Sequence, residues 1–234
     1  NYDRGFQTFV NILGQHAKGP GFPHHEAFDV RAAWRCEADR CAPKTMTAAE
    51  RWLEEHYKEK FFLYVDTWDP HEPWDAPPYY TELYYPGFDG EVIQPPYAYW
   101  QEIPWLNEEK VKKAYATYCG EITMVDRWVG QLLSKLEVMG LMEDTCVIFT
   151  SDHGFCFGEH GGLFGKGVGT RREDGTAIPV GELEDKREGW RRSPLWEEIA
   201  HVPLLVYAPG VEPGTASSLT SAVDLMPTVL DLAG

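Results

Sequence analysis

The sequence predicts an α/β fold with a mainly parallel sheet flanked by helices. Three short apolar runs, at residues 61–65, 145–150 and 202–207, are typical of buried strands. A long amphipathic pattern between Asn107 and Met139 separates the first run from the second. Because parallel neighbours in a sheet need helical connections, this alternation of strands and helices favours the α/β class.

The composition is that of a folded globular chain of one or two domains. Of 234 residues, 43% are hydrophobic and 25% are charged, which excludes disordered and coiled-coil classes. The 37 acidic residues outnumber the 21 basic ones, giving a net charge of −16. Such a chain has no general attraction for nucleic acid or an anionic membrane surface. No apolar run approaches the roughly 20 residues that span a bilayer. We therefore expect neither nucleic acid nor a membrane as a partner.

The cysteines and the first residues bear on processing. The five cysteines are an odd number without a C-x-x-C pair, which favours free thiols and a reducing compartment such as the cytoplasm. The chain begins with Asn1 rather than Met, and no basic segment leads into an apolar stretch. We therefore expect a processed or truncated piece with no visible signal peptide.

The first part of the chain is expected to be irregular. Gly and Pro punctuate residues 1–46, which read as a linking segment. Thr47 and Glu50 have the spacing of a capping box, which predicts a helix ending near Glu59. The apolar run 61–65 then supplies the first strand.

The second part reads as one α/β domain over residues 47–234. Residues 73–105 are rich in Pro, Tyr and Trp without a period, which indicates a long insertion. Its aromatic rings either stack on a sugar or aryl ligand or pack inside the molecule, and packing is the favoured interpretation. Asn107 suits the start of the long helix and Gly140 its end. A last helix is expected at about 221–232.

Three loops carry side chains suited to chemistry on an anion. Asp152 and His153 directly follow the second strand, and ligands collect at the carboxyl ends of strands in open α/β sheets. A carboxylate and an imidazole suit a divalent cation. Lys166, between two glycines, offers a point charge to a tetrahedral oxyanion. His71 lies in a Pro-framed loop and suits a general acid or anion donor. Taken singly, each of these residues also fits an ordinary structural role.

Two further features are weaker candidates. Glu159 and His160 contain metal-ligating groups, but an ordinary hydrogen-bonded loop pair is the favoured interpretation. Cys36 and Arg40 fit a C-x-A-x-R pattern by letter. No apolar strand leads into Cys36, so nothing indicates an activated thiol there.

Four short motifs follow one another along the chain. They are FFLYV at 61–65 leading to DPHEP at 69–73, VIFTSDHG at 147–154, GEHG at 158–161 with GKG at 165–167, and VPLLV at 202–206 with PG at 209–210, closing on VDLMPTVLDLAG at 223–234. In this order they closely resemble the sulfatase family of the alkaline-phosphatase-like superfamily. The resemblance extends over about 47–234, apart from the aromatic insertion and residues 168–190, and implies an alkaline-phosphatase-like sheet.

The resemblance implies roles for four residues. Asp152 and His153 match two ligands of the catalytic divalent cation, and Lys166 matches the lysine that holds the sulfate group. His71 matches the histidine beside the scissile ester oxygen, a candidate acid for the leaving group. The implied reaction is attack on a sulfate ester while the metal, lysine and histidine neutralise charge on the transferring group.

The family's nucleophile is not matched in the expected context. It is a formylglycine made from the Cys or Ser of a C/S-x-P/A-x-R motif, preceded by an acidic pair that completes the metal site. No strand ending in Asp-Asp precedes residue 60, and Cys36 lies too near the strand that leads to His71. We therefore expect this sequence to be the portion of a longer enzyme that follows the nucleophile motif. This portion is expected to be inactive by itself, and the formylglycine is expected in the missing N-terminal part. Such a portion is expected to have an incomplete sheet and exposed apolar surface.

The metal and the ester class stay open. The resemblance implies Ca²⁺ first, an ion that prefers oxygen ligands. Many sulfatases have Asn where this chain has His153, and a His also matches the phosphonate and phosphodiester hydrolases of the superfamily, where Mn²⁺ or Zn²⁺ is favoured. The expected function is sulfuric ester hydrolysis of a small-molecule or glycan sulfate ester. The alternatives are phosphodiester or phosphonate monoester hydrolysis, and a non-catalytic partial domain.

Overall fold

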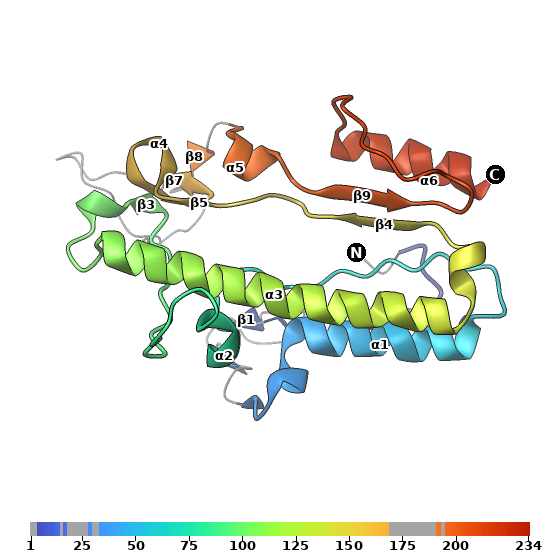
Figure 1. Ribbon diagram of the computed structural model, residues 1–234, viewed down its shortest axis with the longest axis horizontal. Helices are drawn as coiled ribbons and strands as arrows, with labels where there is room; N and C mark the ends of the chain where they lie inside the picture. Colours follow the sequence, from blue (N-terminus) through green and yellow to red (C-terminus); the bar gives the residue numbers. More distant parts are fainter. Residues whose placement is uncertain (1–3, 15, 18–27, 30–32, 169–190, 193–194) are drawn as a thin grey trace.

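The structure, a computed structural model, describes residues 4–14, 16–17, 28–29, 33–168, 191–192 and 195–234. Two helices, α1 (Cys41–His56) and α3 (Glu108–Val138), pack along each other. In Figure 1, α3 lies between α1 and the strand pair β4–β9, with α6 beyond that pair. The chain therefore combines helices and strands, in agreement with the α/β class.

Helix α3 confirms the predicted long helix at both ends. The side chain of Asn107 accepts a hydrogen bond from the backbone N of Lys110 at 2.9 Å. Gly140 follows the last turn with a φ of 73°, a left-handed conformation that ends a helix at little cost for glycine. Local signals at the two ends were therefore sufficient to predict this element.

Helix α1 begins earlier than predicted. Its first residue is Cys41 and its N-cap is Arg40, so the capping box expected at Thr47 is wrong. Pro43 lies in the first turn, where a missing N–H removes no intrahelical hydrogen bond. Pro43 is thus part of the helix start, and α1 extends into the segment 1–46 that was predicted to be irregular.

The described strands pair in four small sheets. The strands are β1 (His16–Ala17) with β2 (Phe28–Asp29), β3 (Ala98–Tyr99) with β6 (Leu163–Gly165), β6 with β5 (Cys156–Phe157), β4 (Val147–Thr150) with β9 (Leu204–Tyr207), and β7 (Gly167–Val168) with β8 (Arg191–Arg192). Every one of these pairs is antiparallel. The parallel pairing expected of the sheet is therefore not found among the residues that the structure describes.

The path between β4 and β9 explains that difference. The described helices on this path, α4 (Glu159–Gly162) and α5 (Glu197–Ala200), have four residues each. A parallel return needs a longer helical crossover. Figure 1 shows the chain leaving β4 towards β5 and α4 and returning through α5 into β9, which therefore runs opposite to β4.

Residues 61–65, predicted as a buried strand, form neither helix nor strand and pair with no described strand. Phe61 and Leu63 pack against the cluster of Leu53, Leu136 and Leu141 between α1 and α3. The alternate side chains, Phe62 and Tyr64, are 61% and 66% exposed. Side-chain exposure therefore alternates from one residue to the next, as in a strand that has one face covered and the other exposed.

The predicted exposed apolar surface is present on β9 and on the last helices. All four residues of β9 are exposed. The end of the chain forms η6 (Ala222–Asp224) and α6 (Leu225–Ala233), close to the predicted helix, and neither contains a buried residue. Exposed apolar patches of this kind mark surfaces that another element or chain covers.

The aromatic-rich segment contains α2 (Pro78–Thr81) and η3 (Trp100–Glu102) and contributes to the core. Trp74 is 1% exposed, with the rings of four aromatic residues around it at centroid distances of 4.9 to 6.3 Å. Those residues are Tyr118, Phe155, Phe157 and Phe164. Tyr80 and Tyr97 are buried as well, whereas Tyr79 and Trp105 are exposed. Packing, the favoured interpretation, holds for the buried rings.

Two other expectations concern the whole chain. All five cysteines lie among the described residues and all are free thiols, which confirms that prediction. Within the described ranges, no helix is both long enough and apolar enough to cross a membrane.

Candidate functional site

The structure brings His71 and Lys166 together. The Nζ of Lys166 lies 3.2 Å from the Nε2 of His71, and 3.3 Å from Oε1 of the buried Glu72. Lys166 follows β6, whose Gly165 pairs with Cys156 of β5. A Cβ at Gly165 would come within 2.9 Å of the Cα of Tyr97. The glycine directly before the lysine is therefore needed for close packing against the backbone of Tyr97.

The contacts of His71 define its hydrogen-bonding state. Its Nδ1 lies 2.7 Å from the backbone oxygen of Glu72, and a carbonyl only accepts, so Nδ1 carries the hydrogen. Nε2 then accepts from the ammonium of Lys166. Burial lowers the pKa of His71, the Glu72 carboxylate opposes that shift, and Lys166 adds to it. The imidazole is therefore neutral near pH 7.

The loop that carries His71 is held by several contacts. The backbone N of His71 donates to the Trp68 oxygen at 3.0 Å, and the two side-chain rings lie 4.4 Å apart. The indole N of Trp74 donates to the oxygen of Pro70 at 3.0 Å. Asp69 accepts from the backbone N of Ala42 in the first turn of α1 at 2.8 Å. The loop is thus tied to a helix rather than left mobile.

A buried carboxyl group lies behind this loop. Glu121 of α3 is 1% exposed and accepts from the backbone N of Asp75 at 3.0 Å. Burial raises the pKa of Glu121 well above its usual range, and the nearby carboxylates of Asp69 and Asp75 add to the effect. Arg40 in turn forms an ion pair with Asp75 at 3.1 Å. The folded protein therefore favours the protonated form of Glu121 more than the unfolded chain does.

Sequence reasoning missed Glu72 and Glu121. Glu72 lies within the DPHEP motif at 69–73, in which only His71 was given a role, and Glu121 lies inside the long amphipathic helix. No local signal marked Glu121, because its neighbour Ile122 is 39% exposed and consecutive residues of a helix face different directions.

Asp152 and His153 follow β4 as predicted. The backbone N of His153 donates to Oδ1 of Asp152 at 2.8 Å, and Nε2 of His153 lies 3.4 Å from Oδ2. The next residue, Gly154, donates to the oxygen of Ile199 at 2.8 Å. A Cβ at Gly154 would overlap the backbone oxygen of Glu198. The glycine therefore allows α5 to pack directly against the residue that follows the Asp–His pair.

A second aspartate, Asp66, lies near Asp152. Burial raises the pKa of Asp66, and the charge of Asp152 adds to the rise. Sequence reasoning did not select Asp66, although it ends the apolar run 61–65 as Asp152 follows β4. Equivalent places after two extended segments were the available signal.

The Asp152–His153 pair fits part of a cation shell. Nδ1 of His153 lies 3.0 Å from the backbone oxygen of Gly154, so Nδ1 carries the hydrogen and Nε2 is left as the ligand atom. Asp152 is largely exposed, with 84% of its side chain open to solvent. Among the described residues, these two side chains belong to no group of three close metal-ligating groups. They supply a carboxylate oxygen and an imidazole nitrogen, and a full shell needs further ligands.

The weaker candidates occupy separate places. Glu159 accepts from the backbone N of Phe157, whereas His160 forms an ion pair with Glu198 at 2.7 Å, so they do not pair with each other. The sulfur of Cys36 lies 3.7 Å from an oxygen of Asp39, and a carboxylate does not activate a thiol.

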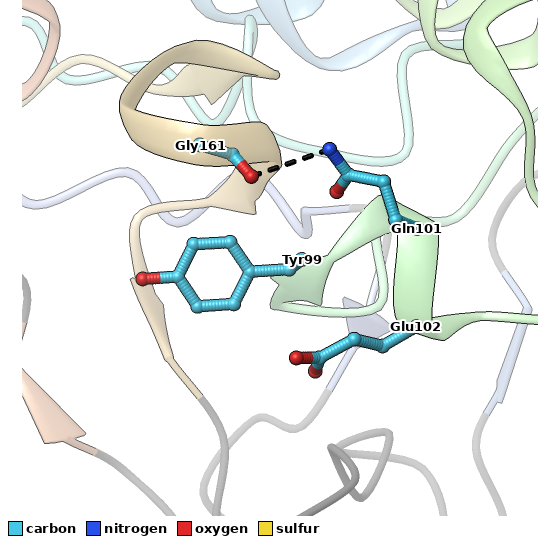
Figure 2. Close-up of a pocket in the computed structure, with 4 residues that line it drawn as sticks. All are labelled: Tyr99, Gln101, Glu102 and Gly161. Carbon is cyan, nitrogen blue, oxygen red and sulfur yellow. Dashed lines mark hydrogen bonds between the residues drawn. The ribbon is translucent and has the colours of Figure 1, made fainter.

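Figure 2 shows a shallow hollow beside α4. Its volume is about 360 Å³, and the amide of Gln101 donates to the oxygen of Gly161 across it at 3.3 Å. Tyr99 and Glu102 complete the lining. None of the predicted site residues lines this hollow, so it adds nothing to the His71–Lys166 pair.

Comparison with known proteins places the chain in a family. Residues 3–234 match the family model described as Sulfatase. The chain is 30% identical over 187 residues to human N-acetylglucosamine-6-sulfatase. The aligned residues cover 75% of this chain and 29% of that protein. It is 28% identical over 192 residues to the arylsulfatase of Clostridium perfringens (strain 13 / Type A), covering 74% of this chain and 34% of that protein. The chain belongs to the sulfatase family.

Two further matches support this assignment. Choline-sulfatase of Rhizobium meliloti (strain 1021) is 30% identical over 129 residues, which is 55% of this chain and 20% of that protein. A solved structure, titled for metabolism of multiple glycosaminoglycans by Bacteroides thetaiotaomicron, aligns with a TM-score of 0.54 and 26% identity over 80% of this chain and 34% of that one. The family assignment and this neighbour confirm the predicted alkaline-phosphatase-like class. The chain spans between 20% and 34% of the length of these proteins.

Proposed function

We propose that the complete protein hydrolyses a sulfate ester at a site that includes His71 and Lys166. The observation that carries this proposal is the 3.2 Å approach of Lys166 Nζ to His71 Nε2. A cation and an imidazole at this distance offer two nitrogens to one tetrahedral anion. The family supports the same reaction class, because the similar proteins are named sulfatases.

Lys166 is proposed to hold the sulfate group. Its N–H now directed at His71 Nε2 turns to a sulfate oxygen when the ester binds, while Glu72 keeps the ammonium in place. Glu72 is only 4% exposed, so its charge is poorly screened and favours a fixed lysine position.

His71 is proposed to act as the acid for the leaving group. A bound anion raises the pKa of a neighbouring imidazole, so substrate binding opposes the effect of burial. The protonated Nε2 can then donate to the ester oxygen as its bond to sulfur breaks. Nδ1 stays bonded to the Glu72 carbonyl throughout, which fixes the ring orientation.

Asp152 and His153 are proposed as two ligands of a catalytic divalent cation. Ca²⁺ is favoured, with Mn²⁺ or Zn²⁺ as the alternatives. A cation there neutralises charge that develops on the transferring group. A formylglycine, in a part of the protein outside this sequence, is proposed as the nucleophile. The substrate is proposed to be a small-molecule or glycan sulfate ester, in line with the range of named relatives.

The proposal is tested by hydrolysis assays on the complete protein with its nucleophile matured. An aryl sulfate and an aryl phosphodiester are compared in parallel, each with Ca²⁺, Mn²⁺ or Zn²⁺. We expect the sulfate to turn over faster and Asp152→Ala to lower that rate at least about a hundredfold. Faster diester hydrolysis would move the enzyme to the other ester class. No turnover of either ester would support a non-catalytic protein.

A further inference from the structure

A second group of metal-ligating side chains lies apart from the proposed catalytic residues. Cys156 of β5, His160 of α4 and Glu198 of α5 place one ligand atom each within 4.8 Å of one another. In the part of the chain that the structure describes, no other three or more His, Cys, Asp and Glu side chains come this close. We propose that these three residues bind a soft divalent cation, with Zn²⁺ as the ion their chemistry fits best.

The ligand types select the ion. A thiolate, an imidazole and a carboxylate form a set typical of zinc, whereas Ca²⁺ and Mg²⁺ prefer oxygen alone. Zn–S and Zn–N bonds of about 2.3 and 2.0 Å place tetrahedral ligand atoms roughly 3.5 Å apart. Ligand atoms that lie up to 4.8 Å apart therefore need to close by about 1.3 Å at most, whereas the His160 and Glu198 atoms, at 2.7 Å, need to open by about 0.8 Å. Side-chain rotations supply shifts of this size.

The backbone and neighbours hold these ligands ready. His160 has a φ of 53°, a left-handed conformation that is uncommon for a residue with a side chain. Its ring stacks on Trp196 at 3.9 Å with an interplanar angle of 7°. Its Nε2 lies 2.7 Å from Oε2 of Glu198. Two of the three ligands are thus already aimed at one another beside the third.

The burial of the three residues suits an open site. Cys156 is fully buried, whereas the side chains of His160 and Glu198 are 31% and 34% exposed. The ion enters from the exposed side, and water or another ligand takes the fourth position. On binding, the thiol of Cys156 releases its proton to solvent. The hydrogen that Nε2 of His160 donates to Glu198 moves through solvent to Nδ1, which leaves Nε2 free to bind the ion. Two metal bonds then replace the His160–Glu198 hydrogen bond.

The site has a structural consequence near Lys166. Cys156 pairs directly with Gly165, the residue before Lys166. A metal that joins β5, α4 and α5 therefore fixes the hairpin that presents the lysine. The proposal does not depend on sulfate ester hydrolysis, because its readout is metal binding and it stands if neither ester is turned over.

The test uses the complete protein, first stripped of metal and then saturated with Ca²⁺. Co²⁺ is titrated as a spectroscopic probe, because a thiolate ligand gives a sulfur-to-metal charge-transfer band that oxygen and nitrogen ligands do not. Zn²⁺ affinity is then measured by competition with a chelating dye. We expect the charge-transfer band in the wild-type protein and its loss in Cys156→Ser. We also expect Cys156→Ser to weaken Zn²⁺ affinity at this site at least about a hundredfold.

Matched controls come from the same region. His201 pairs with Glu197 at 3.0 Å, an exposed His–Glu pair beside the proposed site, so His201→Asn should leave Zn²⁺ affinity within about twofold. Cys146→Ser removes a partly buried thiol that lies directly before β4, and this variant should keep the charge-transfer band. Glu198→Gln, at a half-exposed position, should weaken Zn²⁺ at least about tenfold and decides the matter if Cys156→Ser does not fold. The same band and affinity in wild-type, Cys156→Ser and Glu198→Gln proteins would overturn the proposal.

Discussion

The Nζ of Lys166 lies 3.2 Å from the Nε2 of His71, although 95 residues separate the two in the chain. The β5–β6 hairpin supplies the lysine, and a loop tied to α1 and α3 supplies the histidine. Glu72 lies against both side chains, 3.3 Å from the ammonium and 3.6 Å from Nδ1 of the imidazole. Two nitrogens and one buried carboxylate thus form a compact unit able to receive an anion.

Removing either nitrogen should abolish most of the activity. We expect Lys166→Ala and His71→Ala in the complete enzyme each to lower turnover of an aryl sulfate at least about a hundredfold, because each loses a group that neutralises charge in the transition state. Lys112→Ala is the matched control, since Lys112 pairs with Glu108 on an exposed face of α3. Rates near wild type for both Lys166→Ala and His71→Ala, with folding intact, would refute the site assignment.

The titration of His71 should depend on the ligand. Burial lowers its pKa below the usual 6.5, so the folded protein takes up the proton less readily than the unfolded chain. Stability from this group is therefore complete above pH 6.5 and falls as the pH drops from there through the folded pKa. We expect NMR titration of the imidazole to give a pKa below 6.5, and added sulfate to raise it. A pKa at or above 6.5 without sulfate would contradict the burial argument.

The accuracy of the sequence-based predictions follows the range of the interactions involved. The long helix was predicted at both ends because Asn107 and Gly140 act within one turn. Helix α1 was placed late because Pro43 reads as a loop residue unless its first-turn position is known. The parallel sheet was not found among the described strands because strand direction depends on the whole path between them.

The same distinction applies to the site. His71 and Lys166 were selected from motif order, and their proximity is a finding of the structure. Glu72 and Glu121 were missed because their importance comes from burial, which tertiary packing decides. The ion pair of His160 with Glu198, 38 residues away, likewise depends on tertiary packing and was not predicted from the sequence. Sequence motifs therefore identify candidate charged side chains, whereas the residues that contact them and shift their pKa values are decided by tertiary packing.

Glu121 offers a test of that buried chemistry. Its pKa is raised in the folded protein, so folding favours the protonated acid, and stability is lost as the pH rises from about 4.5 through the folded pKa. We expect Glu121→Gln to keep the hydrogen bond from Asp75 and to remove this loss, so that unfolding midpoints between about pH 5 and 9 vary less than in the wild type. Glu121→Ala should instead destabilise by about 2–4 kcal/mol, because it leaves a cavity and an unsatisfied buried N–H. An unchanged pH profile in Glu121→Gln would show that the group is ionised.

Gly154 and Gly130 form a matched pair for testing how α5 packs behind the Asp152–His153 pair. A Cβ at Gly154 would overlap the backbone oxygen of Glu198, and backbone cannot rotate away as a flexible side chain can. We expect Gly154→Ala to destabilise the protein by about 1–3 kcal/mol, as overpacking does, and to weaken the proposed cation site by displacing Asp152 and His153. Gly130 lies within α3, and a methyl group added there would meet nothing within 4 Å, so Gly130→Ala should stabilise by up to about 1 kcal/mol. Denaturant unfolding and Ca²⁺ titration of both variants measure the two effects. If Gly154→Ala matched Gly130→Ala in both, the close contact between α5 and the Asp–His loop would not exist in solution.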